Sequence, residues 1–155
     1  MQVSSVNSPL APVELAAWRG LLRSHAALVR ELDAELQARH GLSLHEYEVL
    51  LTLAEAPDGR MRMSELAEAV VLSQSGLTRL VDRLVHDGSV ERRRCDGDRR
   101  GFNAELTAAG RKRLREARAT HLAGVRSRFL DRFSEEELGV LAGFWERAVP
   151  GATAE

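Results

Sequence analysis

The sequence has few of the residues that stabilise a secreted or membrane-bound protein. It contains one cysteine, Cys95, which excludes an intramolecular disulfide framework. No apolar run approaches the ~20 residues that a membrane-spanning helix requires. The first residues, MQVSSVNSPLAP, have neither the basic start nor the apolar run of a secretory signal. We therefore expect a cytoplasmic protein with no membrane contact. The 155 residues are 44% hydrophobic but only 5% aromatic, which favours a helical core of Ala and Leu.

The sequence also lacks the common signatures of enzymes and metal sites. There is no Gly-x-Ser-x-Gly nucleophile turn and no glycine-rich phosphate loop. The histidines, at positions 25, 40, 45, 86 and 121, include no pair at the i, i+4 spacing of metal ligands. We interpret them as surface or core-edge residues. We expect no enzyme activity, no catalytic residue, no metal and no cofactor.

Charge is distributed unevenly along the chain. The net charge is −1, but the segment from Arg79 to Arg113 contains ten Lys or Arg and six Asp or Glu. Its local charge of +4 leaves −5 for all the other residues. A basic face on an otherwise acidic molecule is typical of a protein that presents one side to the phosphates of a nucleic acid.

The segment from Met63 to Gly88, MSELAEAVVLSQSGLTRLVDRLVHDG, predicts two short helices joined by a tight turn. Ser73 can cap the second helix, and Gly88 can supply the left-handed residue that ends it, so this helix should run from about Gln74 to Asp87. Apolar residues recur at three- and four-residue spacing and should face the core: Leu77, Leu80, Val81, Leu84 and Val85. This pattern predicts a helix-turn-helix.

The opposite face of the second helix carries short hydrogen-bonding side chains and an arginine. These residues are Gln74, Ser75, Thr78, Arg79, Asp82 and His86. Such side chains read base edges in a major groove, whereas an ordinary solvated helix would be rich in Glu and Lys. A capped amphipathic surface helix is the alternative interpretation.

A basic β-hairpin is predicted directly after this helix. The segments 89–94 and 102–106 have the composition of strands, and Asp96-Gly97 between them is typical of a turn. The tip, from Cys95 to Gly101, is polar and contains Arg99 and Arg100, so it should be exposed. A hairpin in this position is a wing that reaches the neighbouring minor groove. Cys95 is expected as an incidental surface thiol, with a reactive thiol activated by Arg94 as the alternative.

Long helices are predicted on both sides of this unit. One runs from Pro12 or Val13 to about Arg39, too long for one small domain to bury, so part of its apolar stripe should pack on a partner subunit. Others are predicted over residues 44–56, capped by Ser43, from the cap Thr107 to about Phe129, and over residues 135–149, capped by Ser134. We therefore divide the chain into an N-terminal tail (1–11), a dimerisation helix (12–41), a winged helix-turn-helix domain (42–107), C-terminal dimerisation helices (108–149) and a tail (150–155).

The order of these elements resembles that of the MarR family of bacterial transcriptional regulators. The segment DRRGFNAELTAAG, from Asp98 to Gly110, is similar to the family's wing signature of Asp-x-Arg followed by a strand and Leu-Thr-x-x-Gly. The resemblance implies a dimer held by the first and last helices and a roughly palindromic operator. Asp98 and Arg100 match the Asp-x-Arg pair. Many members release DNA when a small aromatic or phenolic ligand binds. Oxidation-sensing members carry a cysteine near the start of the protein, which this chain lacks.

The sequence therefore predicts a sequence-specific regulator of transcription, a ligand-responsive repressor that binds double-stranded DNA as a homodimer. Asp98 should orient the wing, and the expected DNA contacts are Ser73, Gln74, Ser75, Thr78, Arg79, Arg83, Arg99 and Arg100. Trp18 and His25 share a helix face and, with Tyr47, are candidates for a ligand pocket; packing of Trp18 in the dimer core is the alternative.

Two other classes of function stay open at this point. A helical interaction module that sequesters another regulator would not need arginines on a wing. A binder of single strands or RNA would need exposed aromatic residues for base stacking, which the basic region lacks apart from Phe102.

Overall fold

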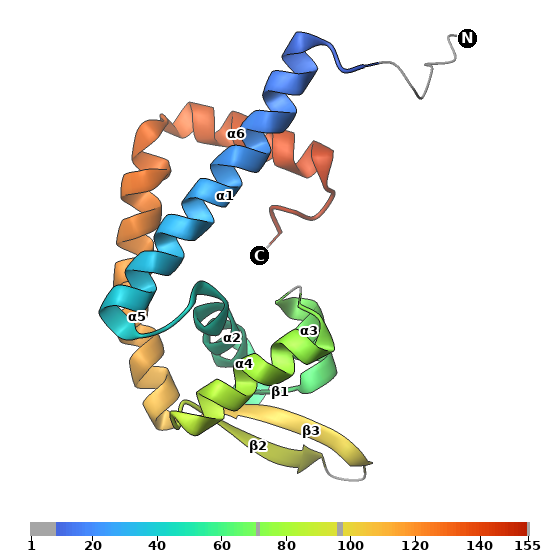
Figure 1. Cartoon of the computed structure of the whole chain (residues 1–155), viewed down its shortest axis with the longest axis vertical. Helices are drawn as coiled ribbons and strands as arrows, with labels where there is room; N and C mark the ends of the chain where they lie inside the picture. Colours follow the sequence, from blue (N-terminus) through green and yellow to red (C-terminus); the bar gives the residue numbers. More distant parts are fainter. Residues whose placement is uncertain (1–8, 71, 96–97, 155) are drawn as a thin grey trace, which may run out of the picture.

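The computed structural model describes residues 9–70, 72–95 and 98–154, which form a mainly helical protein with one small sheet (Figure 1). The elements, in chain order, are α1 (Pro12–His40), α2 (Leu44–Glu55), β1 (Arg60–Arg62), α3 (Met63–Ala69), α4 (Gln74–His86), β2 (Val90–Cys95), β3 (Asp98–Leu106), α5 (Ala108–Arg128) and α6 (Glu135–Ala148). Single 3₁₀ turns lie at Pro57–Gly59 and Leu130–Arg132. No helix among the described residues is long and apolar enough to cross a membrane.

One lobe of the molecule contains α2, α3, α4 and the sheet, as Figure 1 shows. The sheet is antiparallel in the order β1-β3-β2, with β3 in the centre. Its inner face and the apolar sides of the helices share a single core. Fully buried members of this core include Leu50, Leu53, Leu66, Leu77, Val81, Leu84 and Ala104.

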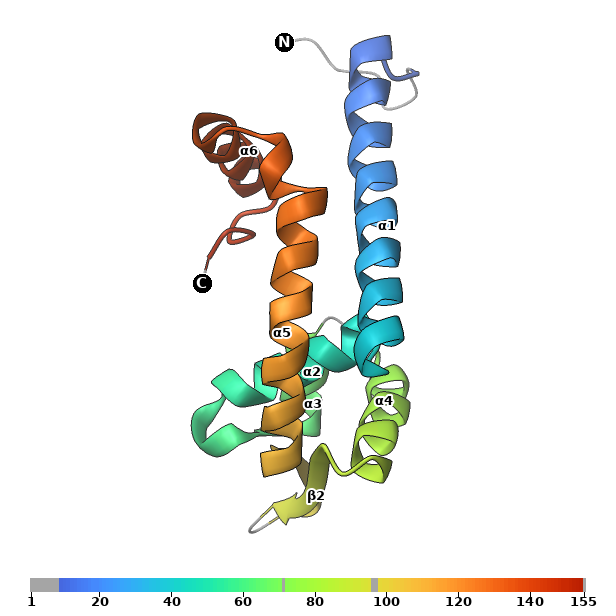
Figure 2. The same ribbon diagram turned by 90° about the vertical axis from the view of Figure 1, so that its left-hand side faces the viewer.

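Two long helices extend away from this lobe. α1 and α5 run antiparallel and lie side by side, and α6 crosses at their far end (Figures 1 and 2). His40 hydrogen-bonds with Thr120 at 2.8 Å near the lobe. Farther out, the Arg128 guanidinium pairs with Glu35 at 2.7 Å. Gly124 permits this close approach, because a Cβ there would lie 2.8 Å from Leu32 of α1.

The far end of these helices exposes a large amount of apolar surface. No residue of α6, which the structure describes completely, is buried. Val140, Phe144 and Trp145 on α6 are exposed, as are Trp18 and Leu22 on α1. Exposed apolar side chains gathered on one part of a molecule are typical of an interaction surface.

The local sequence signals placed most of the elements correctly. Ser43, Ser73, Thr107 and Ser134 each accept a hydrogen bond from the backbone N–H three residues later, so all four predicted caps are confirmed. Gly41 and Gly88 adopt positive φ after α1 and α4, as expected at helix C-termini. α1 ends one residue later and α4 one residue earlier than predicted.

Three expectations about the helix-turn-helix and the wing were wrong. Val85, expected in the core, is 37% exposed, because it lies at the edge of the apolar stripe of α4. β3 begins at Asp98, so the strand includes residues 98–101 that were assigned to the hairpin tip. Cys95 is buried rather than exposed, and its thiol donates a hydrogen bond to Oδ1 of Asn103 at 3.1 Å.

Candidate nucleic-acid interface

α4 presents one polar face to solvent and one apolar face to the core. Leu77, Leu80, Val81 and Leu84 are all buried. Ser75, Thr78 and Arg79 are exposed on the other side, and Ser73 caps the helix by accepting from the Gly76 N–H at 3.1 Å. The first turns of α4 therefore offer short polar side chains to an external partner.

Arg79 and Arg83 lie one helical turn apart but have different surroundings. Among the residues that the structure describes, Arg79 has no hydrogen-bond or ion-pair partner. Arg83 instead donates from Nε to Oε1 of Glu46 at 2.8 Å, and Glu46 is only 7% exposed. Arg79 is thus free for a ligand, whereas Arg83 is already paired within the lobe.

The wing is attached to α4 by Arg92 of β2. Its Nη1 pairs with Oδ1 of Asp82 at 2.9 Å, and its Nη2 lies 3.5 Å from the carbonyl oxygen of Thr78. Asp82, which the sequence placed on the base-reading face, therefore holds the wing. This contact fixes the hairpin relative to α4.

Arg94 extends the same edge toward the tip of the wing. Its guanidinium lies 5.9 Å from the ring centroid of Phe102, which is 41% exposed. Arg92 and Arg94 are not among the DNA contacts expected from the sequence. The alternation of side chains along VERRRC was the available signal, since it puts both residues on one face of β2 and Arg93 on the other.

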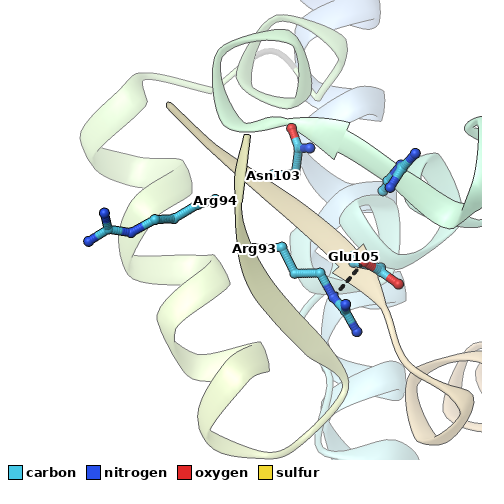
Figure 3. Close-up of a pocket in the computed structure, with 5 residues that line it drawn as sticks. Arg93, Arg94, Asn103 and Glu105 are labelled. Carbon is cyan, nitrogen blue, oxygen red and sulfur yellow. Dashed lines mark ion pairs between the residues drawn. The ribbon is translucent and has the colours of Figure 1, made fainter. Parts of the chain in front are cut away.

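The outer face of the sheet has a shallow polar hollow of about 350 Å³, lined by Arg60, Arg93, Arg94, Asn103 and Glu105. Figure 3 shows Arg93 directed at Glu105, at 2.8 Å, while Arg94 projects from the other side of β2. Arg60 pairs with Asp58 at 3.5 Å. Because Asp58 and Glu105 compensate Arg60 and Arg93, the hollow does not form a concentrated anion site.

The side chains of four predicted site residues lie outside the described part of the structure. They are Gln74, Asp98, Arg99 and Arg100. Their assignments as DNA-contacting residues, and of Asp98 as the residue that orients the wing, stay predictions.

The three residues suggested for a ligand pocket do not come together in one protomer. Trp18 and His25 are exposed on the outer part of α1. Tyr47 is buried at 3% exposure, and its ring lies 4.6 Å from the ring of His121 on α5. At 1.5 Å per residue, Trp18 lies roughly 30 Å along α1 from its lobe end.

The ring of the buried Tyr47 contacts the ring of the half-buried His121, a contact that the sequence did not predict. Burial raises the pKa of Tyr47, partly offset by Arg118. Burial also lowers the pKa of His121, against a smaller opposing effect of Glu48. Nδ1 of His121 is buried and has no hydrogen-bond partner in the described part of the chain. Nothing near His121 in the sequence signals this contact, because Tyr47 lies 74 positions earlier.

A helix-turn-helix with an exposed second helix, followed directly by a basic hairpin, defines the winged helix-turn-helix class. The sequence pattern of the MarR family matches residues 40–101. The transcriptional repressor YetL of Bacillus subtilis is 34% identical over 100 residues, which are 64% of this chain and 59% of YetL. The chain thus aligns with less than two thirds of that relative.

Two solved structures from Streptomyces coelicolor match over nearly the whole chain. AbsC, a MarR family transcriptional regulator, is 35% identical with a TM-score of 0.84, covering 93% of this chain and 94% of AbsC. Sco3205, a regulator of the same family solved in complex with DNA, is 34% identical with a TM-score of 0.87, covering 92% and 93%. The chain belongs to the MarR family of transcriptional regulators, which confirms the resemblance inferred from its motifs.

Proposed function

We propose that the protein represses transcription by binding a pseudo-palindromic operator in double-stranded DNA as a homodimer. The observation that carries this proposal is the exposed face of α4, with Arg79 unpaired among the described residues, beside a wing that Arg92 holds in place. An arginine free of internal partners can form a paired contact with a guanine in the major groove. The name of YetL as a repressor and the DNA complex of Sco3205 support the same function.

Dimerisation is proposed to use α1, α5 and α6. The exposed apolar side chains on α6 and on the outer half of α1 form a surface that a second copy can cover. Two recognition helices would then enter successive major grooves, about one helical turn or 10 base pairs apart. The proposed domain division follows: residues 42–107 bind DNA, and residues 12–41 and 108–149 hold the dimer.

The test is selection of bound duplexes from a random library, followed by titration of the selected duplex and a random duplex. A specific regulator should bind the selected duplex on the order of 10³-fold more tightly than random DNA. Arg79→Ala should narrow this gap, because it removes a base contact. Arg100→Ala on the wing should weaken both duplexes by similar factors, because the narrow minor groove offers negative potential but little sequence code.

A wild-type protein that enriched no duplex would refute the DNA-binding proposal. Equal losses of specificity for Arg79→Ala and Arg100→Ala would refute the assigned roles of helix and wing. The same two variants therefore test the function and the division of labour within it.

A small aromatic or phenolic ligand is proposed to weaken DNA binding. The candidates for its contacts are still Trp18, His25 and Tyr47. Because Trp18 and Tyr47 lie far apart in one protomer, they would belong to different copies of the chain or to different sites. Coupling between two sites is reciprocal, so operator DNA must weaken ligand binding by the same factor, typically ~5- to 150-fold. A ligand that released DNA with unchanged affinity in Trp18→Phe would remove Trp18 from its site.

A further inference from the structure

The first turns of α5 hold the short loop that follows α4, the proposed DNA-recognition helix. The Thr107 hydroxyl lies 2.6 Å from the carbonyl oxygen of Gly88, and the Thr107 N–H donates to the carbonyl of Ser89 at 3.1 Å. Gly110, one turn later, leaves room for the same carbonyl, because a Cβ at this position would overlap the Ser89 oxygen. Ser89 itself is 2% exposed. The loop that follows α4 is therefore held closely against the start of α5.

Arg113, one further turn along the same face of α5, joins this loop to the end of α1. Its Nη1 forms an ion pair with Oδ2 of Asp87 and lies 3.3 Å from the Ser89 hydroxyl. Its Nη2 donates to the carbonyl oxygens of His40 at 3.2 Å and Gly41 at 2.9 Å. One guanidinium thus links three segments that are far apart in the sequence.

Each partner of Arg113 has a defined position in the fold. Asp87 is the C-terminal cap of α4, and its Oδ1 accepts from the Ser89 N–H at 3.0 Å. His40 and Gly41 end α1, where unpaired carbonyls and the helix dipole favour a cation. Burial alone would raise the pKa of Asp87, but its hydrogen bonds with Ser89 and Arg113 outweigh this and lower it. Lysine could not reproduce the contact, since it lacks the planar fork of donors.

We propose that Arg113 is a positioning residue for operator recognition, one that fixes the direction of α4 relative to the α1–α5 pair. In a homodimer held by these long helices, that direction sets the distance between the two recognition helices. The inference rests on the proposed DNA-binding function and adds the residue that couples its two parts. Arg113 need not touch DNA for this role.

The experiment compares Arg113→Gln with Lys112→Gln. Lys112 is the adjacent residue on α5, is 73% exposed and pairs with Glu116 at 4.0 Å. Its variant therefore removes the same charge without touching the junction. Both proteins are titrated with duplexes that wild-type protein has selected from a random library. The selected duplexes are rebuilt with a series of half-site spacings centred on ~10 base pairs, and also with a single half-site.

Wild-type protein and Lys112→Gln should prefer one spacing by about tenfold or more, within the usual range of coupling between sites. Arg113→Gln should bind all spacings within about threefold of one another, while its affinity for the single half-site stays within about twofold of wild type. A general loss of folding would instead weaken the single half-site as well.

Retention of the wild-type spacing preference by Arg113→Gln would overturn the inference while leaving the proposed function intact. Equal weakening of the single half-site and the paired sites, with an unchanged circular dichroism spectrum, would also overturn it. Failure of wild-type protein to select any duplex would refute the function itself. If Arg113→Gln does not fold, Asp87→Asn is tested in its place. The amide oxygen of the new side chain can still accept from the Ser89 N–H, and this variant should also flatten the spacing preference. An unchanged spacing preference in Asp87→Asn would overturn the inference.

Discussion

Arg79 and Arg83, one turn apart on α4, should respond to alanine substitution in opposite ways. Arg83→Ala removes the partner of one oxygen of the buried Glu46 carboxylate, while the other oxygen still accepts from the Ser43 N–H at 2.8 Å. Arg79→Ala removes no internal contact among the described residues. We therefore predict lower stability for the first variant and weaker specific DNA binding for the second.

The size of the stability loss follows from the environment of the pair. An exposed ion pair contributes less than ~1 kcal/mol, whereas a hydrogen bond to a charged, buried group contributes about 1.5 to 3 kcal/mol. Glu46 is buried but the Arg83 side chain is 62% exposed, so we expect about 1 to 2 kcal/mol. For a chain of this size that lowers Tm by roughly 2 to 8 °C. Arg79→Ala should leave the free energy of unfolding within about 0.5 kcal/mol of wild type.

The assay pairs denaturant unfolding with duplex titration for both variants. Unfolding is compared at one protein concentration, because the stability of a dimer depends on it. Adding Glu46→Gln completes a double-mutant cycle, in which Arg83→Ala should cost less when the carboxylate is already absent. Equal destabilisation by the two arginine variants, or additive effects of Arg83→Ala and Glu46→Gln, would refute the reasoning.

Three further outcomes are expected. Phe144→Asp places a charge on the exposed apolar face of α6 and should yield monomers by light scattering without loss of helix content, whereas an intact dimer would show that α6 lies outside the interface. Burial lowers the pKa of His121, so this histidine binds a proton more readily in the unfolded chain than in the folded one. The free energy of unfolding should therefore fall as the pH drops through about 6.5, and His121→Gln should lack this part of the pH dependence. The Cys95 thiol should react with a thiol reagent at least about tenfold more slowly in the native protein than in denaturant, and equal rates would contradict its burial.

Local patterns in the sequence were sufficient to predict most of the fold. The capping boxes at Ser43 and Ser134, and the glycines at 41 and 88, act within one helical turn and fix where helices begin and end. The same kind of signal identified the exposed face of α4, including Arg79. Periodicity gave a wrong prediction at Val85, because it does not determine how wide an apolar stripe the core covers.

The parts of the site that were missed depend on contacts between distant residues. Arg113 meets Asp87 across 26 positions and Gly41 across 72, and nothing near any of these residues in the chain indicates the other two. Arg92 is likewise one of three consecutive arginines; the alternation of β2 separates its face from that of Arg93, but its pairing with Asp82 of α4 has no signal in the nearby sequence. Cys95 sits in a polar segment, and it is buried beside Asn103 of the neighbouring strand, to which its thiol donates; this contact also has no signal in the nearby sequence.

Footprinting on a selected duplex tests the central proposal most directly, namely that two copies of the exposed face of α4 read two half-sites. Wild-type protein should protect guanines in two symmetric major-groove patches, centred about 10 base pairs apart. Arg79→Ala should lose protection at equivalent positions in both patches. A single protected patch, or protection confined to the minor groove and unchanged in Arg79→Ala, would contradict the proposed mode of recognition.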